Sequence, residues 1–288
     1  MHSRIFTPTL SCLILFGTTW VGRPFALAAE DSNLQEDTAA TKNLRTEKAN
    51  EATSPPNDSA GATFLISPED ADFEKPLRDF VAEGRSRIKD FFGAPIPKPF
   101  TVRLSPSRNA FTEFFKKKWG ITESQCWWVA AGVADTFIML SPRVWAKEAC
   151  EHDAHDADHV KGIVMHELVH VFHAQHNAKV EELEEIGWFV EGLAAYASGQ
   201  LEGRHKGAAR KAIETNAAPK KLAKAWSGPH RYGVSGSLVQ YIDVTYGREM
   251  ILKMLPVASQ TDLLNMIKLT EPQLLDAWRK FVLAETQQ

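Results

Sequence analysis

The chain has few cysteines, no excess of either charge and no long hydrophobic run, and each shortage excludes a class of protein. Three cysteines in 288 residues exclude a disulfide-dense miniprotein and a four-cysteine metal cluster. Lys and Arg number 33 against 36 Asp and Glu, for a net charge of −3. This near-balance excludes a nucleic-acid binder that depends on bulk basicity, and it offers no polybasic membrane surface. Hydrophobic residues make up 44% and charged residues 24%, which is typical of a globular domain.

The first residues have the pattern of a secretory signal peptide. Arg4 precedes a short apolar stretch that ends at Phe16, and residues 26–28 (Ala-Leu-Ala) form the small-x-small sequence that signal peptidase recognises. The stretch is shorter than the roughly 20 apolar residues that a membrane span needs. We therefore expect residues 1–28 to be removed on export to the periplasm or the extracellular space, with no membrane span left in the mature chain. The alternative is a buried N-terminal helix.

Residues 29–62 contain no aromatic residue and no Val, Ile or Met. Such a segment buries too little apolar surface to offset the loss of chain entropy on folding. The sequence therefore predicts a disordered linker over 29–62 and one folded domain over 63–288.

The folded part predicts an α+β protein, in which a small mixed β-sheet is followed by a helical lobe. Its first section combines strand and helix patterns, and from residue 158 onward apolar residues recur almost everywhere at helical spacing. The expected strands cover 64–66, 100–104, 127–129 and 133–140. The expected helices cover 73–92, 110–119, 158–177, 187–199, 206–215, 232–246, 248–255, 259–268 and 271–285.

The residues with the clearest chemistry are His166-Glu167-Leu168-Val169-His170, in the first helix of the lobe. Histidines four residues apart project about 40° from each other on one helix face, so their imidazoles can bind one metal ion. Glu167 lies about 100° around the helix from His166, where its carboxylate can act as a base toward a water on the metal. An apolar stripe from Val160 to Phe172 predicts a two-faced helix, with these histidines on the other face.

A second segment supplies a candidate third ligand. Glu191 follows His170 by 21 residues and lies in an otherwise apolar helical sequence, 187–196. A buried carboxylate without a partner is costly, and a metal ion would be such a partner. Gly192 and the alanines after it would let the two helices approach closely. The candidate metal ligands are therefore His166, His170 and Glu191.

These motifs resemble the gluzincin metallopeptidases, which include thermolysin-like and aminopeptidase-N-like enzymes and smaller bacterial peptidase MA-like proteins. The resemblance rests on His-Glu-x-x-His followed by Trp-x-x-Glu-Gly-Leu-Ala-x-Tyr, here residues 166–170 and 188–196. It implies a zincin-like fold, one zinc ion per chain held by His166, His170 and Glu191, Glu167 as the general base, and a peptide or protein substrate. It also implies that a strand from Asp135 to Leu140 forms the sheet edge that pairs with an extended substrate.

One position near the motifs departs from the family pattern, and another resembles a further catalytic residue of the family. Thermolysin-like enzymes carry an acid four residues after the ligand Glu, whereas this chain has Ala195 there, so the residue that supports the zinc ligands is unassigned. Tyr232 resembles the aminopeptidase-type Tyr that donates a hydrogen bond to the oxyanion. His230 is the alternative donor, and ordinary packing is the alternative role for Tyr232.

Several other histidines have simpler interpretations. His159 lies two helical turns, about 10.5 Å, before His166, which is too far to share its metal ion. His173 would ligate only an ion bound one turn lower. His152 and His155 lie among acidic residues, so they belong to a solvated loop or to a loose surface ion site.

Two cysteines, Cys126 and Cys150, remain after signal cleavage. A single disulfide and two buried free thiols are both compatible with an exported chain. Taken together, the sequence predicts an exported zinc metallopeptidase that acts on peptides or proteins and does not bind nucleic acid; it does not indicate an oligomeric state. The alternatives are a catalytically silent relative that binds a metal or a partner, and a histidine-rich helix without metal.

Overall fold

The computed structural model describes residues 61–180 and 184–284. Within these ranges the chain forms ten α-helices and one four-stranded sheet, which confirms the predicted combination of a small mixed sheet and a large helical part. The signal peptide expected over 1–28 and the linker, except for its last two residues, lie outside the described residues.

The sheet is mixed and has the order β1-β2-β4-β3. Strand β2 is parallel to both of its neighbours, β1 and β4, and β3 runs antiparallel to β4. The strands are Ala62–Leu65 (β1), Phe100–Ser105 (β2), Ala130–Val133 (β3) and Thr136–Leu140 (β4). The expectation that Asp135 to Leu140 forms the sheet edge is therefore wrong. That segment is β4, which lies between β2 and β3, and β3 is the edge strand on this side of the sheet.

The strand expected at 127–129 is also misplaced. Trp127 and Trp128 lie in a turn, and β3 begins two residues later at Ala130. The buried Trp128 ring packs against Phe115, with 4.2 Å between ring centres, and its Nε1 donates to the Ala130 carbonyl at 2.9 Å. Trp128 is thus buried in the core, whereas Trp127 is only partly buried.

Every helix expected from the apolar spacing is present, with ends within two residues of the predicted ones. The one α-helix that the sequence did not predict is the four-residue α3. No described helix is long and apolar enough to cross a membrane. The α-helices are Ala71–Phe92 (α1), Arg108–Trp119 (α2), Trp145–Glu148 (α3), Ala157–His176 (α4), Gly187–Ala197 (α5), Ala208–Glu214 (α6), Arg231–Tyr246 (α7), Arg248–Met254 (α8), Gln260–Ile267 (α9) and Glu271–Ala284 (α10).

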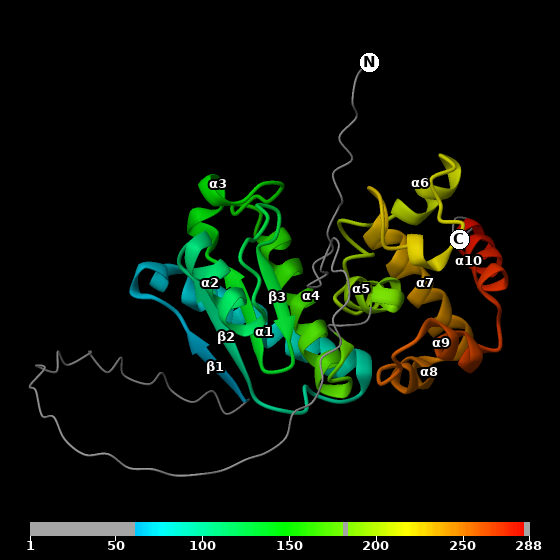
Figure 1. The fold of residues 1–288 in the computed structure, drawn as a ribbon, viewed down its shortest axis with the longest axis horizontal. Coiled ribbons are helices and arrows are strands. Elements are labelled where there is room, and N and C mark those ends of the chain that lie inside the picture. Colours follow the sequence, from blue (N-terminus) through cyan, green and yellow to red (C-terminus); the bar gives the residue numbers. More distant parts are fainter. Residues whose placement is uncertain (1–60, 181–183, 285–288) are drawn as a thin grey trace, which may run out of the picture.

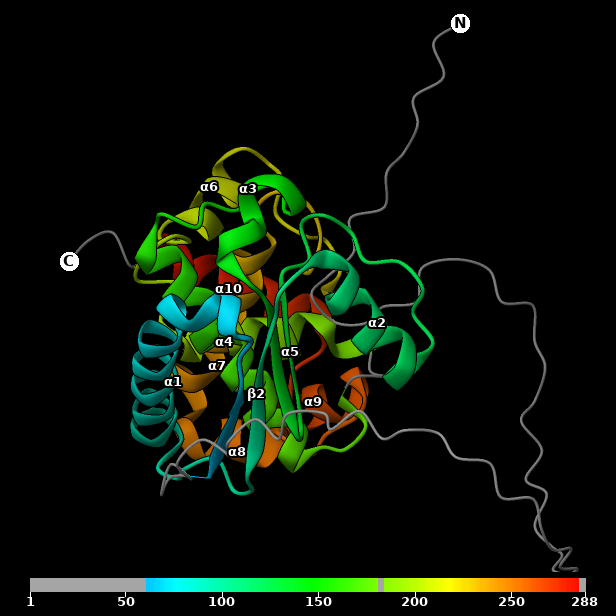
Figure 2. The same cartoon turned by 90° about the vertical axis from the view of Figure 1, so that its left-hand side faces the viewer.

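Helix α4 occupies the centre of the molecule. It packs against β3, β4, α1 and α5, and α5 in turn packs against α7. In Figure 1, α2 and α3 lie on the sheet side of α4, and α5 to α10 form the helical part on its other side. Figure 2 shows the sheet from the front, with α1 and α2 flanking it and the helical part behind. The motif helix is thus enclosed between sheet and helices.

This enclosure overturns the expectation of a two-faced motif helix. All residues from Met165 to Ala174 are buried, so the histidine face is covered as well as the apolar stripe. The start of the helix follows the sequence signal, since the Asp156 side chain accepts a hydrogen bond from the His159 backbone N–H at 3.0 Å, an N-cap that satisfies one of its free donors.

Cys126 and Cys150 form a disulfide, with their Cα atoms 5.2 Å apart. Of the two alternatives that the sequence left open, the disulfide is the one that forms. The bridged loop contains β3, β4 and α3.

Candidate metal centre

Three side chains from α4 and α5 converge in the interior. His166 Nε2 lies 3.1 Å from His170 Nε2 and 3.3 Å from Glu191 Oε2, and His170 Nε2 lies 3.7 Å from the same oxygen. All three residues are buried, and one ligand atom from each lies within 4.8 Å of the others. The residues predicted as metal ligands are therefore brought together, and they could hold a metal ion.

Glu191 has the surroundings of a ligand. The residue is fully buried, and its Oε1 makes no hydrogen bond to the described part of the chain. Burial alone would raise the pKa of its carboxyl, but the neighbouring imidazoles, His170 first, outweigh burial and lower this pKa to about 2. The carboxylate is thus ionised, and an ionised carboxylate at this depth requires a cationic partner. Two imidazole nitrogens and one carboxylate oxygen are a donor set that suits zinc.

Gln200 supports the ligand His166 from outside the cluster. His166 Nδ1 donates to Gln200 Oε1 at 3.0 Å, and Gln200 Nε2 donates to the Gly162 carbonyl at 3.3 Å. Because Nδ1 donates to Gln200, Nε2 is the nitrogen that faces the cluster and could bind a metal ion. Gln200 was missed at the sequence level because it follows α5 and belongs to no local motif. Ala195, where thermolysin-like enzymes have an acid, is fully buried.

Glu167 lies beside the ligand cluster and lines a cavity of about 370 Å³ that also borders His166. Its Oε2 accepts a hydrogen bond from the backbone N–H of Gly132 in β3 at 2.8 Å. A Cβ atom on residue 132 would lie 1.9 Å from the Glu167 carbonyl oxygen. Only glycine therefore lets the edge strand come close enough to orient this carboxylate.

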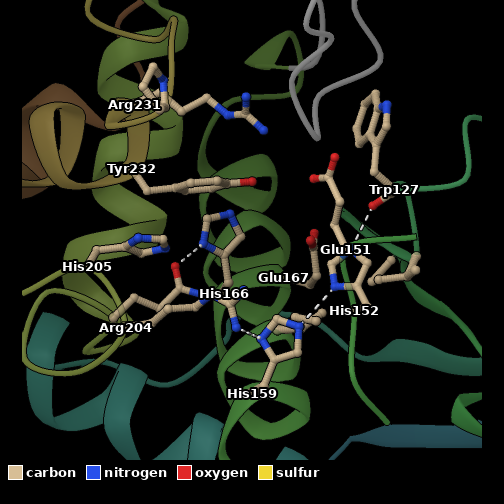
Figure 3. Close-up of a pocket in the computed structure, with 15 residues that line it drawn as sticks. Trp127, Glu151, His152, His159, His166, Glu167, Arg204, His205, Arg231 and Tyr232 are labelled. Carbon is tan, nitrogen blue, oxygen red and sulfur yellow. Dashed lines mark hydrogen bonds between the residues drawn. The ribbon is translucent and has the colours of Figure 1, made fainter. Parts of the chain in front are cut away.

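Tyr232 borders the same pocket from the first turn of α7. Its ring is 5.8 Å from the His166 ring and stacks on His205 at 4.8 Å. Figure 3 shows its hydroxyl directed into the pocket, beside His166. The alternative donor, His230, is the N-cap residue of α7 and is not among the residues that line this pocket.

Gly192 brings α7 to this position. A Cβ atom on residue 192 would lie 2.3 Å from the Ser235 carbonyl oxygen of α7. The sequence predicted that Gly192 would admit the motif helix α4, but its close contact is with α7 instead. Gly192 therefore lets α5 pack closely against α7, the helix that carries Tyr232.

The remaining histidines of α4 do not join the cluster. His173 is fully buried, and burial lowers its pKa to about 3; its Nε2 donates to the Leu255 carbonyl at 3.0 Å. Burial, with a smaller contribution from Arg204, lowers the pKa of His159 to about 4. Each is therefore a neutral imidazole with a structural hydrogen bond.

His152 and His159 form a hydrogen-bonded chain at the far side of the pocket. Arg204 Nη1 donates to His159 Nδ1 at 3.0 Å, which leaves the His159 proton on Nε2 to be donated to His152 Nδ1 at 2.9 Å. His152 Nε2 then donates to the Trp127 carbonyl at 2.8 Å. His152 thus holds a pocket wall and is not a site for a loose ion, whereas His155 lies in an exposed loop beside Asp153.

No protein-family model, curated protein or solved structure matches this chain.

Proposed function

We propose that this protein is a zinc-dependent hydrolase of the gluzincin type that cleaves peptide bonds. One observation carries the proposal: His166, His170 and Glu191 converge in a buried cluster, and a further carboxylate, Glu167, lies beside them in a pocket. Three protein ligands with a remaining open position are typical of catalytic zinc, whereas structural zinc has four. A pure metal-binding protein has no need of a pocket that reaches the ligand His166 and contains an additional carboxylate.

In this proposal, His166, His170 and Glu191 would hold the ion, and the hydrogen bond to Gln200 would keep His166 in the correct tautomer. A zinc ion held there supplies a Lewis acid that lowers the pKa of water and polarises a carbonyl. The Glu167 carboxylate takes a proton from the attacking water and delivers it to the leaving amine. Its hydrogen bond from Gly132 fixes the carboxylate in one orientation, which favours transfer along a defined path.

The first experiment combines metal content and cleavage. The chain purified from an exporting host, without chelator and without added metal, should contain about one zinc ion, as three ligands and an open position imply. Mass spectrometry of the metal gives this ratio, and incubation with a peptide library followed by sequencing of the products gives the activity. Zinc without cleavage would favour the silent alternative, and a chain that neither retains nor takes up zinc would refute the proposal.

Tyr232→Phe tests the proposed oxyanion donor. If the hydroxyl donates to the oxyanion, its removal costs a hydrogen bond that strengthens only in the transition state. We expect kcat to fall by about 10² to 10³-fold with KM and zinc content almost unchanged. Steady-state kinetics on a peptide identified in the library provide the measurement. A variant with lower thermal stability and near-normal kcat would show that Tyr232 serves only in packing.

A further inference from the structure

Arg231, the first residue of α7, projects into the same pocket as Tyr232 and Glu167. In Figure 3 its guanidinium extends over the space between the two pocket walls, on the side of Tyr232 away from His166. Two aromatic rings support it: the guanidinium carbon lies 5.5 Å from the centre of the Trp226 ring and 5.3 Å from that of Tyr232. Such rings position a cation over their faces and leave its N–H groups available for other partners.

Arg231 has no acidic partner among the side chains of residues 61–180 and 185–284. Its buried Nε makes no hydrogen bond there, and the first turn of α7 contains no acidic residue and no side-chain cap. The N-terminus of a helix carries a partial positive charge, so an additional cation at this place is unfavourable unless an anion offsets it. A cation at this position is therefore unfavourable for the fold, although its guanidinium faces the pocket.

The other arginine of this pocket differs in its contacts. Arg204 donates to His159 and thereby holds the His152–His159 chain behind the opposite wall. The carboxylates that line the pocket are Glu151 and Glu167; Glu167 accepts its hydrogen bond from Gly132, and neither forms an ion pair with Arg231 within the described chain. Of the two arginines that line this pocket, Arg204 thus has a hydrogen-bond partner in the described chain, and the Arg231 side chain has no hydrogen bond or ion pair there.

We propose that Arg231 binds a carboxylate of the peptide substrate and so determines which peptides are cleaved. The forked guanidinium matches a carboxylate through two parallel hydrogen bonds. Tyr232 lies between His166 and Arg231 along the wall (Figure 3), so the bound carboxylate belongs to a part of the substrate close to the cleaved bond. It is either the C-terminal carboxylate or an acidic side chain. This inference rests on the proposed peptidase function.

Binding to the zinc-loaded Glu167→Gln protein tests the inference without turnover. The probes are N-acetyl-tetraalanine with a free C-terminus, the same peptide as its C-terminal amide, and that amide with one alanine replaced by glutamate. Calorimetry should show one carboxylate peptide binding about 10- to 100-fold more tightly than the neutral amide, as expected for hydrogen bonds to a charged group. Tighter binding of the peptide with the free C-terminus would show that the site takes a C-terminal carboxylate. Tighter binding of the glutamate amide would show that it takes an acidic side chain.

Variants of the two arginines provide the comparison. Arg231→Gln should remove the preference for the carboxylate peptide, and Arg231→Lys should retain part of it, because the charge stays and the fork is lost. Arg204→Gln, the matched control at the other arginine that lines the pocket, should keep the full preference. Circular dichroism checks that each variant is folded. If Arg231→Gln does not fold, the carboxylate preference of Arg231→Lys is compared with that of the wild type instead.

Equal binding of all three peptides, binding of none, or a preference that survives in Arg231→Gln would each overturn the carboxylate site. Cleavage kinetics of the wild-type protein separate this result from the proposed function. Hydrolysis without a carboxylate preference refutes the role of Arg231 and leaves the peptidase proposal intact. A carboxylate preference without hydrolysis of any peptide refutes the peptidase proposal and leaves the binding site.

Discussion

Glu167→Gln should retain zinc and lose hydrolysis by about 10² to 10⁴-fold, the usual contribution of a general base. The amide has nearly the same shape as the carboxylate, and its oxygen can still accept the hydrogen bond from the Gly132 N–H. The amide cannot take a proton from water, however, so the loss should appear in kcat. Glu167 also lies outside the group of three ligand atoms, and the metal content should therefore not change.

The measurement is kcat on a cleaved peptide, with zinc determined on the same preparation. Glu151→Gln is the matched control, because it removes the other carboxylate that lines the pocket without touching the metal cluster. That control should keep kcat within a few-fold of the wild-type value, as expected for a surface substitution. Near-normal turnover in Glu167→Gln would show that another group activates the water.

Glu191→Ala should abolish stoichiometric zinc binding while the chain remains folded. The carboxylate supplies one of three ligand atoms, and two imidazoles alone leave the ion without its anionic ligand. The surrounding helix is held by its own apolar core, including the buried Trp188, Phe189 and Leu193. The neighbouring imidazoles lower the pKa of the Glu191 carboxyl to about 2 and so favour its ionised form in the folded chain. Removing the carboxylate takes this attraction away, so the metal-free variant should melt somewhat below the metal-free wild type but still unfold cooperatively.

Zinc content per chain and thermal melts of both proteins after chelation provide the measurement. His173→Asn is the matched control, because His173 is buried on the same helix as the ligands but bonds to the Leu255 carbonyl. That variant should retain its zinc even if its stability falls. Full zinc retention by Glu191→Ala would mean that a different residue is the third ligand. Zinc loss by His173→Asn alone would identify His173 as that ligand.

The parts of the site that could be predicted from the sequence are those set by local geometry. His166 and His170 share a helix face because four residues make slightly more than one turn, and their convergence follows from the helix alone. Glu191 could be identified because a single carboxylate in the apolar segment 187–196 is costly to bury without a partner. The helix ends followed in the same way from caps and apolar spacing.

The parts that could not be predicted depend on contacts between distant segments. Strand β3 consists of Ala130, Ala131, Gly132 and Val133, a sequence with little intrinsic preference for a strand. It forms because it pairs with β4 and packs closely against α4 at Glu167. Gln200 likewise reaches His166 across 34 residues, and no pattern in its own neighbourhood indicates this contact. Burial of the histidine face of α4 has the same origin, since it is α5 that covers it.

The disulfide has a consequence for the order in which the protein matures. Trp127 and Glu151 directly follow the two bridged cysteines, and both belong to the wall opposite Tyr232 and Arg231 (Figure 3). The three side chains that could hold a metal ion, by contrast, lie on α4 and α5, outside the bridged loop. Oxidation of the cysteines and formation of this cluster therefore depend on different parts of the chain. In a reducing compartment the cluster could still form, but the wall that contains Trp127 and Glu151 would be held in place only after the thiols are oxidised.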